Sequence, residues 1–160
     1  MTIFRPLADS GAEADRVAAL WHDSWHDGHA ALLPPPIVAQ RDLGSFAARL
    51  VPLAAQSMVA VEDGTIVGFG ALVEDEIDQL FVARDARGTT VAAGLLAALE
   101  DRLRDAGVTR AEVQCLQGND RALAFYARHG WNVTGRADLP LWMPEGQSAS
   151  HPTLMLAKDL

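Results

Sequence analysis

Four consecutive residues, Arg87, Gly88, Thr89 and Thr90, have the types and the spacing to bind an anion. They follow an apolar stretch that favours a strand and precede a long segment with helical periodicity, so they lie where a helix begins. About four N–H groups at a helix start have no partner inside the helix, and together with the helix dipole they favour a phosphate. Gly88 allows a close backbone approach, Arg87 offers a cation that can bond two oxygens, and the threonines offer hydroxyls.

This turn alone does not identify the chemistry, because an ordinary capped helix with a turn glycine has the same pattern. Two phosphate-binding motifs are absent from the sequence: GxxxxGK[ST] and GxGxxG. The sequence therefore excludes a P-loop and a dinucleotide fingerprint, and it leaves open an anion site of another kind.

A second motif, "NDRALAFYARHGW", spans Asn119 to Trp131. Together with the turn, it resembles the signatures of the GCN5-related N-acetyltransferase (GNAT) family, which uses acetyl-CoA. The first family signature, [QR]-x-x-G-x-[GA] after a Leu-x-Val type segment, is similar to "LFV" followed by "RGTTVA" here. The second signature, N-x-x-[AS]-x-x-[FL]-Y-x-x-x-G-[FWY], matches at every position: Asn119, Ala122, Phe125, Tyr126, Gly130 and Trp131.

Thr90 departs from the family turn, which carries glycine at its position. A Cβ there would crowd a pyrophosphate if the backbone needed a positive φ, whereas a threonine already in the helical conformation would be tolerated. We expect the helical conformation, and the effect of Thr90 on coenzyme affinity stays open.

The resemblance implies an α/β fold with a mixed central sheet of six to seven strands and about four helices. Two central parallel strands, Glu76–Val82 and Arg110–Leu116, would splay apart and hold acetyl-CoA in the wedge between them. The pyrophosphate would bind the N–H groups of Arg87, Gly88, Thr89, Thr90, Val91 and Ala92. The pantetheine arm would pair with the backbone of Leu80, Phe81 and Val82, where an N–H could also stabilise an oxyanion. Asn119 would contact the pantetheine or the nearby chain.

The resemblance also implies roles in catalysis. Tyr126 would donate a proton to the CoA thiolate, because a phenol with a pKa of about 10 stays protonated at neutral pH. The alternative is an aromatic packed on an amphipathic helix. Glu76 and Asp78 lie two residues apart at the start of the central strand, so their side chains point to the same face. Both could therefore face the acceptor and take the proton of the amine. A carboxylate desolvated there would have a raised pKa, but solvated strand-end charges, with bound water as the base, are the alternative.

The function implied is transfer of an acetyl group from acetyl-CoA to a primary amine by direct attack in a ternary complex, in a single domain over residues 1–160. The acceptor is unidentified, and a small amine, an amino-acid-like compound or a protein amine would fit. The alternative is a non-catalytic acyl-CoA-binding sensor or interaction module. A homodimer is possible by analogy with the family.

Three histidines, His22, His26 and His29, lie within eight residues of each other on a predicted helix. No carboxylate pattern such as HExxH accompanies them, so we expect no metal site. With Trp21 or Trp25, they are better placed to line an acceptor pocket.

Composition indicates which binding partners and which cellular compartment to expect. Thirteen basic and twenty-one acidic residues give a net charge of −8, which disfavours nucleic acid and suits either a cationic substrate or simple solubility. Cys115 is the one cysteine, so no disulfide forms within the chain, and its apolar strand suggests an inert core thiol. The chain shows no apolar signal core and no membrane-spanning run, so we expect a cytoplasmic protein.

The elements that must position these residues follow from periodicity and turn signals. Strands are expected over residues 2–8, 57–63, 65–74, 76–83, 110–116, 131–136 and 153–160. Asp63-Gly64 signals a hairpin turn between the second and the third of them. Helices are expected from Asp9 or Ser10 to the "LLPPP" segment, and over residues 37–51, 89–106 and 119–130. Gly107 should end the helix over 89–106. The composition of residues 137–152 suits an irregular loop, in which Trp142 and Met143 could cover the acceptor site or a dimer contact.

Overall fold

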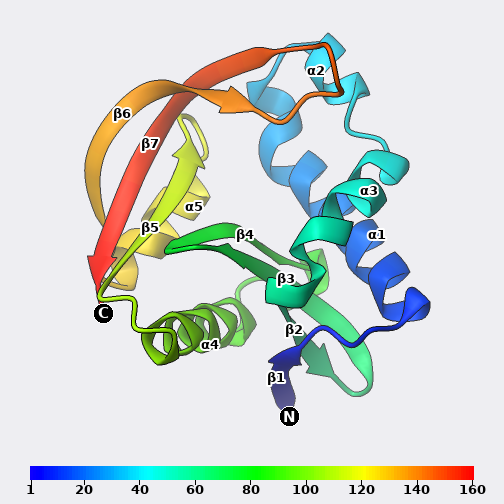
Figure 1. Ribbon diagram of the computed structural model, residues 1–160, viewed down its shortest axis with the longest axis vertical. Helices are drawn as coiled ribbons and strands as arrows, with labels where there is room; N and C mark the ends of the chain where they lie inside the picture. The colour runs from blue at the N-terminus through cyan, green and yellow to red at the C-terminus, as the bar shows by residue number, and fades with distance from the viewer.

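The computed structural model describes all residues from 1 to 160. Its strands form one seven-stranded sheet in the order β1-β2-β3-β4-β5-β7-β6, and β4–β5 is the one parallel pair (Figure 1). The strands are β1 (Thr2–Pro6), β2 (Ser57–Glu62), β3 (Thr65–Val73), β4 (Glu76–Val82), β5 (Arg110–Leu116), β6 (Asn132–Leu141) and β7 (Ala149–Asp159). The helices are α1 (Gly11–His29), α2 (Pro35–Ala39), α3 (Leu43–Leu53), α4 (Val91–Asp105) and α5 (Asp120–Arg128). Short 3₁₀ turns cover 30–32, 54–56 and 84–86. None of the helices has the length and apolar character that crossing a bilayer requires.

Helix α4 packs tightly against the sheet and so fixes the turn that precedes it. Its leucine stripe is buried in one core cluster with residues of β4, β5 and α5. Gly70 of β3 makes the close approach possible, because a Cβ there would lie 2.6 Å from Cδ1 of Leu99. Helices α1 and α3 pack in a second core cluster with β2 and β3. The sheet is therefore covered on both faces beside the start of α4.

The two parallel strands diverge, as the family resemblance led us to expect. β4 pairs with β5 only at Glu76 with Glu112 and at Ile77 with Val113. Beyond these pairs the strands separate in a V (Figure 1). The backbone edge of β4 from Asp78 onward therefore has no strand partner on the side that faces β5.

The prediction of an irregular loop over residues 137–152 holds only for residues 142–148 and is wrong at both ends. β6 continues to Leu141 and β7 begins at Ala149, so the two strands form a long hairpin that pairs Asp138 with Pro152. Pro140 is tolerated because β6 is an edge strand, and Pro152 is tolerated because the pairing of β7 with β5 ends at Thr153. The hairpin arches across the molecule toward the α2 end, so its tip lies over the region between the sheet and the helices (Figure 1).

The prediction of one helix over residues 37–51 is wrong only at residues 40–42, where the helix is broken. The chain leaves the helical conformation after α2, and Asp42 caps a new helix by accepting a hydrogen bond from the N–H of Ser45 at 2.7 Å. Pro52 is accommodated in the last turn of α3. The break places Arg41 between the two helices.

The hairpin turn predicted at Asp63-Gly64 is confirmed, with φ values of 49° and 78°. The predicted helix end at Gly107 is confirmed as well, because its φ of 85° is the left-handed conformation that ends a helix.

Candidate active site

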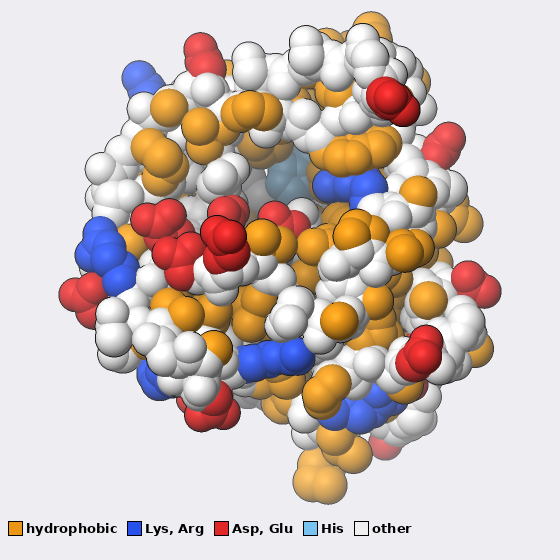
Figure 2. All heavy atoms as spheres, in the orientation of Figure 1, with side chains coloured by type: hydrophobic (Ala, Val, Ile, Leu, Met, Phe, Trp, Pro, Cys, Tyr) orange, Lys and Arg blue, Asp and Glu red, His pale blue; other side chains and the backbone are white.

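A cavity of about 830 Å³ lies where β4 and β5 separate. Its walls come from both strands, from α1, from α3 and the segment before it, from the turn before α4, from α5 and from the tip of the β6–β7 hairpin. Figure 2 shows it as a hollow with acidic side chains gathered on one side, basic side chains on the other and a histidine deep inside. The splay of the sheet therefore creates an open pocket.

The turn before α4 presents a set of unpartnered backbone N–H groups. No backbone acceptor binds the amides of Gly88, Thr89, Thr90, Ala92 and Ala93. The Arg87 N–H donates to the Arg84 carbonyl at 3.2 Å, and the Val91 N–H donates to the Thr89 hydroxyl at 3.3 Å. The free amides cluster at the positive end of the helix dipole, which is the arrangement that binds a phosphate.

Thr90 is helical, with φ −81° and ψ −2°, and it is the residue that precedes α4. The positive φ of the turn, 71°, falls on Gly88, and a Cβ there would meet no atom within 4 Å. The expectation of a helical Thr90 is confirmed, so the backbone does not require glycine at that position.

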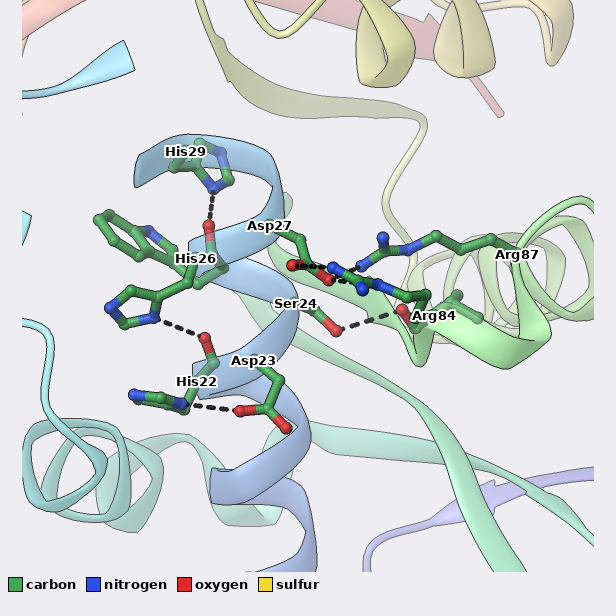
Figure 3. Close-up of polar contacts among 10 residues, drawn as sticks. His22, Asp23, Ser24, His26, Asp27, His29, Arg84 and Arg87 are labelled. Carbon is green, nitrogen blue, oxygen red and sulfur yellow. Dashed lines mark hydrogen bonds and ion pairs between the residues drawn. The ribbon is translucent and has the colours of Figure 1, made fainter. Parts of the chain in front are cut away.

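Two side chains of this turn, those of Arg87 and Thr89, are bonded within the protein. Asp27 of α1 accepts hydrogen bonds from Arg84 at 2.6 Å and from Arg87 at 3.1 Å (Figure 3). The bonds from Arg84 and Arg87 hold the pKa of Asp27 below its usual value. The Thr89 hydroxyl donates to the Ala86 carbonyl. The backbone amides, rather than these side chains, are therefore the groups free to meet an anion.

Leu80, Phe81 and Val82 lie along the unpaired edge of β4 and line the cavity. The carbonyl of Val82 accepts a hydrogen bond from the buried hydroxyl of Ser24 at 3.2 Å (Figure 3). This bond ties α1 to the end of β4 and steadies the strand edge.

Tyr126 of α5 also lines the cavity, with 7% of its surface exposed. It packs edge-on against Phe125 and Trp131. Burial raises its pKa above the ordinary phenol value, with a smaller contribution from Cys115, so the hydroxyl is protonated at neutral pH. Burial also raises the pKa of the Cys115 thiol to about 11, so this environment disfavours a thiolate.

Glu76 and Asp78, at the start of β4, both line the cavity. Partial burial, and then the charges of Asp78, Glu112 and Asp75, raise the pKa of Glu76 to about 7. At neutral pH its carboxylate is therefore poised to gain or lose a proton.

Asn119 lies at the start of α5 and faces α1. Its side-chain oxygen accepts a hydrogen bond from the Ala122 N–H at 3.4 Å, which caps the helix, and its Nδ2 lies 3.4 Å from Nε2 of His29. Burial lowers the pKa of His29 to about 4, so this histidine is neutral.

The predicted pocket role of the aromatic residues of α1 holds for two of them. His29 and Trp25 line the cavity, stacked with their ring centroids 5.4 Å apart. Trp21 does not, because it is fully buried against Phe46 and Phe69.

His22 and His26 do not line the cavity either. His26 Nδ1 lies 2.7 Å from the carbonyl of His22, one turn earlier, and His22 pairs with exposed Asp23 (Figure 3). No group of three or more histidine, cysteine, aspartate or glutamate side chains is arranged to hold a metal ion.

Two arginines, Arg41 and Arg49, line the cavity and were missed by sequence reasoning. Each lies over the ring of Trp142 from the hairpin, with the guanidinium carbon 5.1 Å and 4.8 Å from the ring centroid. The sequence carries no signal for this, because arginine near a helix end usually faces solvent. Trp142 therefore covers the cavity, whereas the sequence left open whether it covers the acceptor site or a dimer contact.

Comparisons with known proteins agree with this geometry. A family model described as the acetyltransferase (GNAT) family matches residues 17–131. Uncharacterized N-acetyltransferases of Mycobacterium tuberculosis and Mycobacterium bovis are each 29% identical over 116 residues, or 63% of this chain and 74% of the relative.

Solved structures share the fold over the whole chain. A GCN5-related N-acetyltransferase from Rhodopseudomonas palustris has a TM-score of 0.77 at 25% identity, and the match covers 100% of this chain and 96% of that one. The PaiA N-acetyltransferase of Thermoplasma acidophilum, solved in complex with coenzyme A, has a TM-score of 0.73 at 15% identity, covering 100% and 99%. Since the family model spans more than half of the chain, and contains the turn before α4 as well as α5, the protein belongs to the GNAT acetyltransferase family.

Proposed function

We propose that this protein transfers the acetyl group of acetyl-CoA to a primary amine. The observation that carries the proposal is the divergence of β4 and β5, which leaves an unpaired strand edge leading to a turn of free backbone amides. A coenzyme with a peptide-like arm and a diphosphate matches both parts, since the arm can pair with the edge and the diphosphate can bind the amides.

In this arrangement the diphosphate meets the amides of Gly88, Thr89, Thr90, Ala92 and Ala93. Arg87 and Val91 complete the turn, but their N–H groups are already bonded within the chain. The pantetheine arm follows Leu80, Phe81 and Val82, which carries the thioester into the cavity. Asn119 closes the α5 side beside His29.

The reaction is a direct transfer. The neutral amine attacks the thioester carbonyl carbon, a C–N bond forms, and an N–H of the β4 edge stabilises the oxyanion. The C–S bond then breaks, and the sulfur leaves with the bonding electron pair. The proton lost by the amine passes to Glu76, directly or through water, because the pKa of Glu76 near 7 makes it an effective base at neutral pH. Asp78 raises that pKa and adds negative charge that attracts the amine in its protonated form, before the proton is lost.

Tyr126 donates its phenolic proton toward the departing sulfur. The raised pKa of Tyr126 keeps the phenol protonated at neutral pH, so its proton is available when the sulfur leaves.

Incubation of the protein with acetyl-CoA and a panel of primary amines tests the proposal. We expect CoA thiol release that depends on both enzyme and amine, with the N-acetylated amine identified by mass spectrometry. Calorimetric binding of CoA without transfer to any amine would instead support a coenzyme-binding module without catalysis. No binding of CoA would overturn both.

A further inference from the structure

We propose that the acceptor carries a carboxylate close to its primary amine, as an amino acid does, and that Arg41 and Arg49 bind this carboxylate. This inference rests on the proposed acetyl transfer and names the chemical class of its acceptor.

Arg41 is a buried cation without a counterion. Only 3% of its surface is exposed, yet its Nε is buried without any hydrogen-bond partner. Its polar contact within the chain is a long one, 3.8 Å from Nη1 to the sulfur of Met143. It lies between aromatic rings, with its guanidinium carbon 5.2 Å from the Trp25 centroid and 5.1 Å from that of Trp142.

Arg49 repeats this pattern from α3. Its Nη1 is also buried without a partner, and its guanidinium carbon lies 4.7 Å from the Trp21 centroid and 4.8 Å from that of Trp142. Burial, and then the positive charge of Arg41, lower its pKa to about 10. The two like charges therefore lie close enough to disfavour each other, and neither forms an ion pair.

Two desolvated guanidinium groups without an anion are costly, because the aromatic faces replace only part of the lost hydration. A bound carboxylate would relieve this cost, since its two oxygens match the fork of donors on a guanidinium. The arginines line the same cavity as the amide turn and Tyr126, so an anion bound to them lies in the site itself.

The cavity also has a negative side. Glu76 and Asp78 line it, and Asp75 and Glu112 add to the negative potential at Glu76. The negative charge of Asp78 acts on Arg49 and partly offsets the lowering of its pKa by burial. These acidic side chains and the two arginines therefore share the pocket without forming an ion pair. A zwitterion fits this arrangement of charges with its amine at Glu76 and its carboxylate at the two arginines. A purely cationic acceptor would place no anion on Arg41.

The test compares ligand pairs that differ only in the carboxylate. Steady-state kinetics would use L-leucine against isopentylamine and L-phenylalanine against phenethylamine. Calorimetry would use the N-acetylated product of each member, so that binding is measured without turnover. We expect the carboxylate member of each pair to be favoured at least about tenfold in kcat/KM and in affinity.

The preference for the carboxylate ligand is the ratio of kcat/KM, or of affinity, between the two members of a pair. Arg41→Gln and Arg49→Gln should each reduce this ratio toward one, and Arg49→Lys should retain part of it. Arg110→Gln is the matched control, because Arg110 forms an exposed pair with Asp159 at the other end of β5. Thermal unfolding would establish that each variant is folded. The comparison of ligand pairs on the wild-type protein tests the proposal without any variant. Dipeptides distinguish a free amino acid from a peptide N-terminus.

A ratio near one for the wild-type protein, in both kinetics and calorimetry, would overturn the carboxylate site while amine acetylation stood. Binding of N-acetyl amino acids that depends on Arg41 and Arg49, without any acetyl transfer, would instead support the anion site and overturn the proposed reaction. The two claims therefore fail by different results.

Discussion

At the scale of single residues, the proposed reaction depends on where two protons lie. Tyr126 holds one because burial raises its pKa, and Glu76 can accept the other because burial and neighbouring acids raise its pKa to about 7. The same physical cause, a desolvated pocket, thus prepares both an acid and a base.

Tyr126→Phe removes the proton donor and keeps the ring that packs against Phe125 and Trp131. We expect kcat to fall about 100-fold, because a positioned general acid typically contributes that much, while the affinity for CoA changes little. Stopped-flow or steady-state thiol release measures the rate, and calorimetry measures the affinity. An unchanged rate across the pH range would exclude the acid role.

Glu76→Gln should alter the pH dependence of the reaction. In the wild-type enzyme kcat/KM should rise with pH through about 7 as Glu76 loses its proton, and this rise should be lost in the variant. Asp78→Asn serves as the comparison, since it removes one of the charges that raise the pKa of Glu76 and should move the rise to lower pH. If Glu76→Gln retained the wild-type profile, the base would be another group or water.

The same pKa shift predicts the pH dependence of stability. The folded state binds the Glu76 proton more tightly than the unfolded chain does, so between about pH 4.5 and pH 7 the native state carries more protons at this site. The free energy of unfolding therefore falls as pH rises through this window. In Glu76→Gln that contribution should be absent, so chemical denaturation at pH 5 and pH 8 should differ less than in the wild-type protein.

At the scale of elements, the two sides of the V are joined by the two residue pairs between β4 and β5 and by the apolar core under α4. Glu100 of α4 adds a polar connection. Its buried carboxylate accepts hydrogen bonds from Nε1 of Trp131 at 3.0 Å and from Nζ of Lys158 at 2.9 Å. Trp131 follows α5 and Lys158 lies on β7, so this cluster joins the α4 side of the sheet to the β5–β7 side.

Glu100→Ala should lower the free energy of unfolding by about 3 kcal/mol, because it leaves a partly buried ammonium and an indole N–H without their acceptor. Glu100→Gln should cost less, since its amide oxygen can still accept from the indole. Asp101→Ala is the matched control, because its side chain is 71% exposed and its loss should cost under about 0.5 kcal/mol. Urea unfolding gives the values, and equal costs for Glu100→Ala and Asp101→Ala would show that the cluster does not join the two sides.

At the scale of the whole molecule, the sequence predicted the parts that local signals determine. Helical periodicity located α1, α4 and α5, and the Asp63-Gly64 turn located the β2–β3 hairpin. The two motifs indicated the splayed sheet, because they resemble those of a known family.

The rest depends on contacts between residues far apart in the chain. The outer parts of β6 and β7, residues 137–141 and 149–152, were missed because these polar, proline-containing segments gain order only by pairing with each other. The arginine cluster was missed for the same reason, since Arg41 and Trp142 meet only when the hairpin folds over the cavity. The break before α3 did have a local signal in Asp42, which caps the helix through Ser45.

The central claim is that coenzyme A lies in the V between β4 and β5 with its diphosphate on the turn before α4. Titration of ¹⁵N-labelled protein with CoA, followed by amide NMR, tests it most directly. We predict the largest shifts at the free amides of Gly88, Thr89, Thr90, Ala92 and Ala93, together with shifts along Leu80–Val82. Binding that leaves these amides unperturbed, or no binding at all, would contradict the account.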